Sequence, residues 1–531
     1  MHKKLFSSGV KGVLAACIFA GVLTSCHKDK PAANNDNNNP APSVSTGDTT
    51  AIKEDSLRYL MYQIMQVTYA DGGRTANRGL PTYYWYSSVP VLNPFDTKFA
   101  NADSLLAAMK RYAINPTTNA PYDRYSFLDR SGVLTNKLMN GVSSSTTYFS
   151  ASGDLGLQYA PVLADANGTV RIFVLYTDKN SPAGKAGVTR GWEITGINGV
   201  TSFSSTSSSL SYIYRSIMES DNVSLEFKRP DGTKVTYALA QSTYNINPVV
   251  FDTVFSVPVG LSTQKVGYFV FYTYASTFNA NGQPTVTKTE LDKVFTKFQS
   301  AGIKNLIVDL RYNGGGATTT AEYLDSAIAP SSAANNLMYS YQYNDKLMAV
   351  INDIQLTSKV NFPSQTGGLQ LDNVFFVVSR NTASASELTI NNLKPYMSVK
   401  LIGDSTYGKP VGFIDFNITM YDANHQQKYL ADLYAINFET KNAKGEGGYY
   451  TGMAANTFAN DYVNVPWGST SDQNLQQAVS FISDGKFQTI NKNARAAREA
   501  VNLFTPIEKA TPLSTFNGMV DFRLSKEARR R

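Results

Sequence analysis

The chain has 531 residues, 42% hydrophobic and 17% charged, a composition that excludes an intrinsically disordered protein. Its length exceeds one ordinary hydrophobic core, so several domains are expected. The formal charge of +7 falls to +4 once Lys3, Lys4 and Lys11 of a predicted leader are removed, which is too small and too dispersed to favour a nucleic-acid partner.

The N-terminus has the pattern of a bacterial lipoprotein leader. Lys3 and Lys4 precede an apolar run over residues 12–23, which is too short to span a bilayer and suits a signal peptide. The run ends in Leu-Thr-Ser-Cys, which resembles a lipobox with Cys26 as the lipidated residue. The sequence therefore predicts a signal peptide over residues 1–25, with a plain secretory leader as the alternative.

Residues 26–50 are rich in Asn, Asp and Pro, and they are predicted to be a flexible tether. With Cys26 lipidated, the protein is expected in the bacterial cell envelope. It would be anchored to the outer membrane and face either the periplasm or the cell surface.

Cysteine and histidine are scarce. The two cysteines are Cys17, inside the leader, and Cys26, so no disulfide or thiol nucleophile is expected in the mature fold. The one histidine beyond the tether is His425, in a predicted hairpin turn. A Cys/His metal site is therefore not expected, no cofactor is predicted, and a Ser-His hydrolase would depend on His425 alone.

Residues 51–144 have helical periodicity. Leu57, Leu60, Met61 and Ile64 fall on one helical face. The pattern predicts an N-terminal helical domain.

Residues 145–240 alternate short strands with turns. Gly156, Leu157 and Gln158 precede a β-rich segment, and residues 181–187 (Ser-Pro-Ala-Gly-Lys-Ala-Gly) precede a second one. These segments resemble the carboxylate-binding loop and the short helix of a bacterial PDZ domain. The resemblance implies that free backbone N–H groups at the three loop residues bind a peptide C-terminus beside an edge strand. The alternative is an unrelated β-rich spacer.

Residues 241–490 alternate helices and strands, as in an α/β domain. Residues 305–310 and 374–378 are predicted to be buried strands, and the first runs into the glycine run 314–316. That run lacks the Lys-Ser/Thr of a phosphate-binding P-loop, so an oxyanion donor is the better interpretation. Residues 491–531 are predicted to be a weakly determined C-terminal extension.

Ser384 is a candidate nucleophile. It follows a predicted strand and begins a helix, where free N–H groups stabilise developing negative charge, and the N–H of Ala385 can contribute to an oxyanion hole. The alternative is structural, because the four residues from Ser384 to Glu387 have the pattern of a helix capping box.

Lys409 is the candidate general base. It lies 25 residues after Ser384, in a glycine-flanked turn after a predicted parallel strand that would return beside the start of the helix. A lysine base must be neutral, so its pKa must fall from about 10.4 to about 7–8, a shift worth about 4 kcal/mol that burial can supply. The alternative is a solvated turn lysine.

Three segments together resemble the C-terminal processing peptidases, also called tail-specific proteases, and especially their lipoprotein members from Bacteroidota-like bacteria. The segments are residues 309–316 (Asp-Leu-Arg-Tyr-Asn-Gly-Gly-Gly), 382–387 (Thr-Ala-Ser-Ala-Ser-Glu) and 406–409 (Thr-Tyr-Gly-Lys). The resemblance covers roughly residues 50–485. It implies an α/β multidomain fold: a helical N-terminal domain, a PDZ-like domain and a peptidase core of the ClpP/crotonase-like type.

The resemblance also implies site residues. Ser384 would be the nucleophile, Lys409 the general base, and the N–H groups of Ala385 and Gly315 the oxyanion hole. The expected activity is serine-type endoproteolysis of unfolded or C-terminally presented proteins, without a cofactor. Peptide substrates and a membrane anchor are the expected partners, and the sequence leaves a homo-oligomer open.

The chain departs from this family at the residue that orients the lysine. Many members carry Gln four positions after the lysine or Asp eleven after the serine, where this chain has Phe413 and Pro395. Ser405, Thr406 or a residue outside the three segments is a candidate substitute, and the sequence does not identify which. The departure motivates a second hypothesis, an inactive peptide- or ligand-binding lipoprotein on the same fold.

Overall fold

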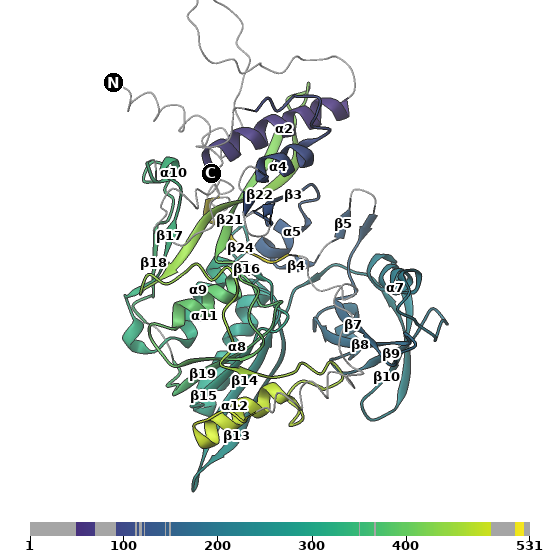
Figure 1. Cartoon of the computed structure of the whole chain (residues 1–531), viewed down its shortest axis with the longest axis vertical. Helices are drawn as coiled ribbons and strands as arrows, with labels where there is room; N and C mark the ends of the chain where they lie inside the picture. The colour runs from purple at the N-terminus through teal and green to yellow at the C-terminus, as the bar shows by residue number, and fades with distance from the viewer. Residues whose placement is uncertain are drawn as a thin grey trace, which may run out of the picture.

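The computed structural model describes residues 49–68, 92–111, 114–115, 119–121, 123–143, 145–147, 150–349, 351–365, 368–489 and 516–524 (Figure 1). The predicted signal peptide, the lipidation site Cys26 and nearly all of the tether lie outside these residues. Within the described ranges, no helix is both long enough and apolar enough to cross a membrane.

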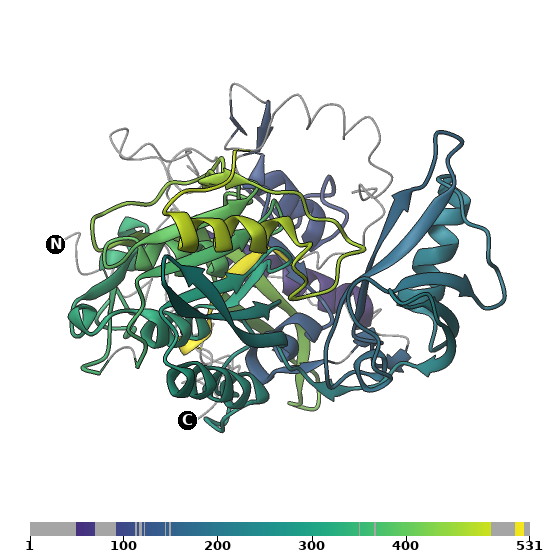
Figure 2. The same cartoon turned by 90° about the horizontal axis from the view of Figure 1, so that it is seen from below.

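A five-stranded antiparallel sheet occupies most of the predicted PDZ-like segment and lies to one side of the molecule (Figures 1 and 2). Its order is β11 (Lys234–Ala240), β10 (Asn222–Lys228), β9 (Glu193–Ile197), β8 (Val170–Thr177) and β7 (Leu157–Leu163). Helices α6 (Pro182–Lys185), α7 (Ser207–Tyr214) and the π-helix η3 (Arg215–Glu219) accompany it. The sheet has its own hydrophobic cluster, and β7 is an edge strand.

A six-stranded sheet forms the centre of the α/β part. Its order is β13 (Val249–Val259), β14 (Ser262–Phe271), β15 (Asn305–Asp309), β19 (Asn373–Val378), β20 (Val399–Gly403) and β23 (Thr457–Phe458). All neighbouring pairs are parallel except β13 with β14. Helix α12 (Gln473–Asp484) shares one hydrophobic cluster with it, whereas α8 (Val286–Ala301), α9 (Thr318–Ile328) and α11 (Ala385–Leu393) share the other.

A seven-stranded sheet completes the core. Its order is β16 (Gly315–Ala317), β24 (Gly518–Asp521), β21 (Val411–Tyr421), β22 (Gln427–Asn442), β17 (Leu337–Gln342) and β18 (Lys359–Asn361), and β3 (Phe127–Asp129) also pairs with β22. Strand β16 begins inside the glycine run, and β21 begins two residues after Lys409. The sheet therefore brings both candidate site segments together.

Helices α2 (Thr49–Thr68) and α4 (Ala102–Lys110) belong to the predicted N-terminal helical domain. Leu57, Met61 and Ile64 are buried in the same hydrophobic cluster as β21 and β22. The described part of this segment therefore shares the core of the α/β part, as the position of α2 beside β22 in Figure 1 shows.

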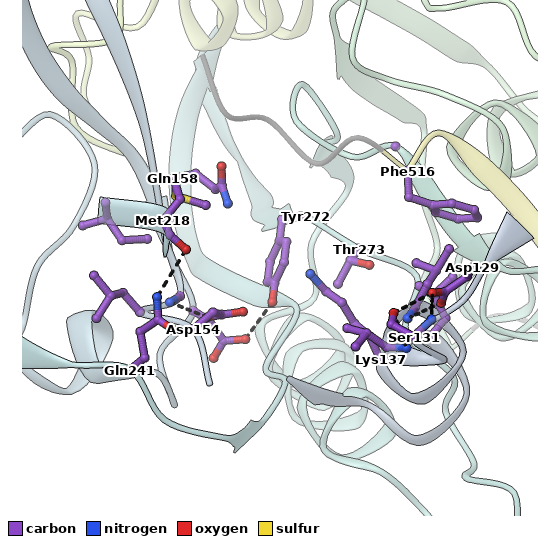
Figure 3. A pocket seen from close by; sticks show the side chains of 18 of the residues that line it. Asp129, Ser131, Lys137, Asp154, Gln158, Met218, Gln241, Tyr272, Thr273 and Phe516 are labelled. Atoms are coloured by element: carbon purple, nitrogen blue, oxygen red, sulfur yellow. Dashed lines mark hydrogen bonds between the residues drawn. The ribbon is translucent and has the colours of Figure 1, made fainter. Parts of the chain in front are cut away.

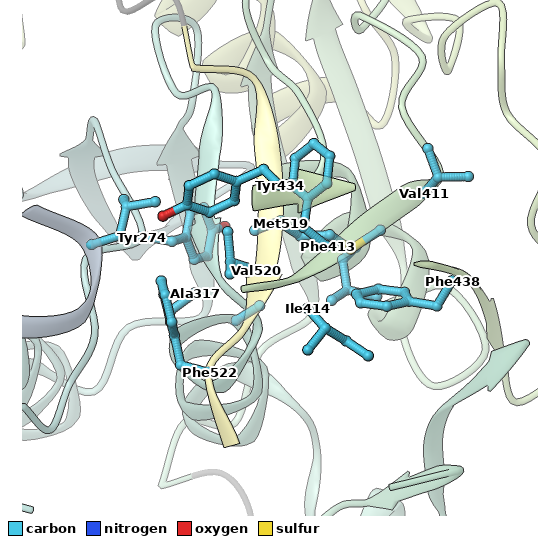
Figure 4. Packing of buried hydrophobic residues seen from close by; sticks show 14 of the residues in the cluster. Tyr274, Ala317, Val411, Phe413, Ile414, Tyr434, Phe438, Met519, Val520 and Phe522 are labelled. Carbon is cyan, nitrogen blue, oxygen red and sulfur yellow. The ribbon is translucent and has the colours of Figure 1, made fainter. Parts of the chain in front are cut away.

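The described part of the predicted C-terminal extension, residues 516–524, packs into the core of the α/β part. Strand β24 is fully buried, with Met519 and Val520 in the main hydrophobic cluster beside Phe413 (Figure 4). Because this strand pairs with partners about 200 and 100 residues earlier, its own sequence carries no local signal of its position.

The other short elements complete the structure as described: β1 (Ile114–Asn115), β2 (Ala120–Pro121), α5 (Val133–Thr135), η2 (Asn136–Asn140), β4 (Val142–Ser143), β5 (Ser145–Thr147), β6 (Ser150–Ser152), β12 (Tyr244–Asn245), η4 (Ser331–Ala333) and α10 (Asp345–Ala349).

Candidate active site

Ser384 lies in the tight turn between β19 and α11, at the N-cap of the helix. Its backbone has φ 58° and ψ −104°, a conformation that a non-glycine residue rarely adopts. The residue is fully buried. Strained backbone of this kind persists only where the surroundings impose it, and it is concentrated at functional sites.

Glu387 joins the serine turn to the lysine turn. Its Oε2 accepts the backbone N–H of Ser384 and that of Lys409, both at 2.8 Å. Its Oε1 accepts the N–H of Gly408 at 2.7 Å and the hydroxyl of Thr406 at 2.5 Å. Burial raises the pKa of Glu387, and these four donors oppose that shift by stabilising the carboxylate.

The capping-box pattern therefore describes real geometry, and it does not compete with a functional interpretation. The N–H of Ser384 is bonded to the N3 glutamate, and the same carboxylate also holds the loop that carries Lys409. Sequence reasoning recognised Glu387 only as a helix cap. Its second role depends on a turn 22 residues later, which the local pattern does not contain.

Lys409 is 1% exposed, and its amine is enclosed by aromatic rings. The Nζ atom lies 3.9 Å from the ring centroid of Phe413 and 4.6 Å from that of Tyr125, and it donates a hydrogen bond of 2.5 Å to the carbonyl of Asn517. Burial lowers the pKa of Lys409 well below its usual range, and the charges of Asp123 and Glu387 oppose the shift only in part.

The hydroxyl of Ser384 lies 3.5 Å from the carbonyl of Val411, two residues after Lys409. Among the hydrogen bonds of the described residues, none joins Ser384 Oγ directly to Lys409 Nζ. Catalytic hydrogen bonds are often long or unformed before substrate binds, so this arrangement is compatible with a nucleophile and its base.

Gly315 and Ala385, the two predicted oxyanion donors, lie side by side. A Cβ built on Gly315 would be 3.0 Å from the N–H nitrogen of Ala385. However, the N–H of Gly315 already donates to Asn313 Oδ1 at 2.9 Å. The structure therefore brings the predicted pair together without leaving the Gly315 donor free.

Gly315→Ala is expected to reduce both stability and any activity of this site. Gly315 has φ +111°, and an added Cβ would meet the carbonyl oxygen of Gly518 at 2.3 Å. We expect a lower melting temperature and at least about a tenfold loss of peptide cleavage. Gly445→Ala is the matched control, because Gly445 also has positive φ but an added Cβ there meets nothing within 4 Å. Equal behaviour of the two variants would contradict the prediction.

The predicted peptide-binding residues lie at the start of edge strand β7. Leu157 and Gln158 pair with β8, which leaves the other edge of β7 unpaired in the five-stranded sheet. The N–H of Gly156 is not free, because Asp154 Oδ1 accepts it at 2.5 Å. Capture of a terminal carboxylate by this N–H is therefore not supported by the geometry.

A cavity of about 870 Å³ lies between the five-stranded sheet and the candidate site (Figure 3). In Figure 3, Gln158 and Met218 lie on one side of the cavity and Phe516 lies on the other, and Leu157 and Gly315 are also among its lining residues. In Figure 3, Tyr272 stands between these two groups. The cavity connects the edge strand with the glycine segment that contacts Ala385.

The structure also locates the other residues that the sequence singles out. The ring of Phe413 packs beneath the lysine amine, and Thr406 donates to Glu387, whereas Pro395 lies beyond the end of α11. His425 lies in the hairpin between β21 and β22, 16 residues after Lys409 and at the far end of β21 from the lysine turn. Tyr125 and Asn517 were missed, because nothing in their own segments indicates the site.

The comparisons agree with the predicted resemblance. Residues 265–427 match the model of Peptidase family S41. The chain is 26% identical over 200 residues to the chloroplastic C-terminal processing peptidase of Tetradesmus obliquus, covering 37% of this chain and 38% of that one. It is 26% identical over 259 residues to the carboxy-terminal processing protease CtpB of Bacillus subtilis, covering 48% and 47%. The chain thus spans less than half the length of these curated relatives.

The fold is shared with a crystal structure from Bacteroides fragilis, provisionally named an S41 protease. The two superpose with a TM-score of 0.55 at 20% identity, covering 83% of this chain and 99% of the other. The predicted α/β multidomain class is thereby confirmed. As the resemblance to the C-terminal processing peptidases predicts, the chain contains a peptidase family S41 domain, matched over residues 265–427.

Proposed function

We propose that the chain is a serine endopeptidase in which Ser384 is the nucleophile and Lys409 the general base. One observation carries the proposal. A fully buried lysine and a strained, buried serine are held by the same carboxylate, that of Glu387. A buried lysine with a lowered pKa is the form that can accept a proton near neutral pH.

In the proposed reaction, neutral Lys409 takes the proton of Ser384 Oγ as this oxygen attacks the scissile carbonyl carbon. The N–H of Ala385 stabilises the resulting oxyanion, and the N–H of Gly315 joins it by exchanging its bond to Asn313. Protonated Lys409 then gives its proton to the leaving amine, and the acyl-enzyme forms. Lys409 then takes a proton from water as the water oxygen attacks the ester carbonyl, and it gives this proton to Ser384 Oγ as the bond between Oγ and the acyl carbon breaks.

The proposed substrate is an unfolded or C-terminally presented polypeptide. Strand β7 offers an unpaired edge to which an extended peptide can add, and the cavity runs from Leu157 and Gln158 towards Gly315. The guanidinium of Arg190, in the five-stranded part, donates hydrogen bonds to the hydroxyl of Tyr312 and to the carboxylate of Asp461 in the α/β part. These bonds support a fixed position of the five-stranded sheet beside the candidate site. This segment would act as the PDZ domain of the enzyme.

The proposed location is the bacterial cell envelope. The lipobox-like sequence ending in Cys26 and the Asn- and Pro-rich residues 26–50 support a lipid-anchored protein on a tether. Metabolic labelling with a fatty-acid analogue, compared between the natural chain and Cys26→Ala, tests this part of the proposal.

A fluorophosphonate probe tests the catalytic assignment, since only an activated serine reacts with it quickly. We expect labelling at Ser384 that rises with pH as Lys409 loses its proton, with a midpoint below 10.5 because burial lowers this pKa. Ser384→Ala should remove the labelling, whereas Ser483→Ala, on α12 and bonded to Pro258, should react normally. Absent labelling together with tight peptide binding would favour the inactive peptide-binding protein instead.

A further inference from the structure

The C-terminal strand β24 lies between β16 and β21 in the seven-stranded sheet, one strand in from its edge. It runs parallel to β16 on one side, with Gly518 opposite Gly315, and parallel to β21 on the other. Met519 and Val520 are completely buried, and Figure 4 shows Val520 and Phe522 packed among the neighbouring core side chains. Removing this strand would expose the core, so it is an integral part of the fold and not a peptide that can leave.

The residue just before this strand, Asn517, contributes a main-chain carbonyl oxygen that contacts the candidate base. The carbonyl of Asn517 accepts the hydrogen bond of Lys409 Nζ at 2.5 Å, and it is the amine's only hydrogen-bond acceptor among the described residues. The amine is otherwise enclosed by the rings of Phe413 and Tyr125, which offer faces but no directional acceptor. The direction of the amine is thus set by Asn517.

We propose that the main-chain carbonyl of Asn517 is the positioning group for Lys409, so that the C-terminal strand completes the catalytic apparatus. The inference rests on the proposed function and deepens it. A lysine side chain has four rotatable bonds, and fixing one N–H on a rigid carbonyl leaves the remaining positions of the nitrogen to face the serine. Phe413 stands where the resemblance to the C-terminal processing peptidases implies an orienting glutamine, and in this chain the acceptor comes from residue 517 instead.

The main-chain carbonyl of Asn517 is held by one hydrogen bond of the next residue and by tight packing around that residue. The N–H of Gly518 donates to the carbonyl of Gly314 at 2.9 Å, which ties the strand to the glycine segment beside Ala385. Residue 518 has no room for a side chain, because a Cβ there would lie 2.4 Å from the ring of Phe516 and 2.8 Å from the ring of Phe413. A side chain at position 518 would therefore displace the strand or these two rings, whereas a changed side chain at 517 would leave the main-chain carbonyl of Asn517 present.

Four variants of the full chain test the inference, with the second-order rate of fluorophosphonate labelling and the melting temperature as readouts. Gly518→Ala is expected to slow labelling at least about tenfold. Asn517→Ala, which keeps the carbonyl, should label within about twofold of the natural chain. Phe522→Leu is the matched structural control, because Phe522 is buried just after the same strand and makes none of the contacts given above for the lysine amine. The double variant Phe516→Leu/Gly518→Ala removes the clash with Phe516 but keeps the 2.8 Å approach to Phe413, so it should recover part of the rate.

The outcomes separate the alternatives. If Gly518→Ala and Phe522→Leu lose labelling in proportion to their melting temperatures, the strand has only a structural role and the inference is wrong. If Gly518→Ala labels faster, the strand restrains the lysine, and the inference is also wrong. Should Gly518→Ala not fold, the double variant is compared with Phe522→Leu in its place: a loss of labelling at a normal melting temperature supports the inference, and a loss only in proportion to the melting temperature overturns it. Lys409→Met labelling at the natural rate would refute the proposed function itself.

Discussion

Lys409→Met is expected to abolish peptide cleavage and, at neutral pH, to raise the melting temperature. Methionine matches the length of the lysine stem and suits the rings of Phe413 and Tyr125, so the fold should be kept. Loss of a general base costs about 10²–10⁴-fold in rate, so we expect a loss of at least about 10³-fold in kcat when cleavage of an unfolded protein is measured.

The stability effect follows from the lowered pKa of Lys409. The pKa of Lys409 is lower in the folded chain than the 10.5 of the unfolded chain, so protons bind the unfolded chain more tightly. The lysine therefore reduces the free energy of unfolding at neutral pH. This reduction becomes smaller as pH rises towards 10.5, where the amine is losing its proton in both states. The melting-temperature advantage of Lys409→Met should therefore shrink between neutral and alkaline pH. Lys394→Met is the control, since burial also lowers the pKa of Lys394, but its amine contacts Met453 instead. Retained cleavage in Lys409→Met would refute the assignment.

The parts of the site that the sequence predicts are those whose signals are local. Ser384 and Lys409 each lie in a short turn at the end of a strand, with glycine or a helix start beside it, and a parallel strand order brings such turns together. The scarcity of cysteine and histidine removes the competing nucleophiles. The serine–lysine pair could therefore be chosen from the sequence, although its geometry could not.

The groups around the lysine amine could not be predicted, because they come from distant segments. Tyr125 precedes Lys409 by 284 residues and Asn517 follows it by 108, and Asn517 contributes a main-chain atom that any residue type would provide. For the same reason the sequence does not predict β24: it is only four residues long, and its place depends on partners far along the chain. Burial of the N-terminal helices against β21 and β22 is likewise a tertiary outcome.

Glu387→Gln is expected to reduce both stability and activity severely, because one carboxylate organises both turns. An amide offers one acceptor oxygen and one donor NH₂, so whichever way it is oriented, two of the four donors now facing Glu387 lose their acceptor. Each buried donor left unsatisfied costs about 1–3 kcal/mol, and the total loss in the free energy of unfolding should be about 2–6 kcal/mol. Cleavage should fall at least about 10²-fold, since the Ser384 and Lys409 backbones lose their common partner.

The control for this variant is Glu54→Gln. Glu54 also joins two segments, accepting the N–H of Ala102 and the guanidinium of Arg130, but it lies in the N-terminal helices away from Ser384. The Glu54→Gln variant should unfold at a lower denaturant concentration than the natural chain, while its kcat stays within about twofold. Glu387→Gln should instead lose kcat even at temperatures where circular dichroism shows it fully folded. A folded Glu387→Gln enzyme with normal kcat would show that the two turns keep their geometry without the carboxylate. The proposal that Glu387 holds the Ser384 and Lys409 turns together would then be wrong.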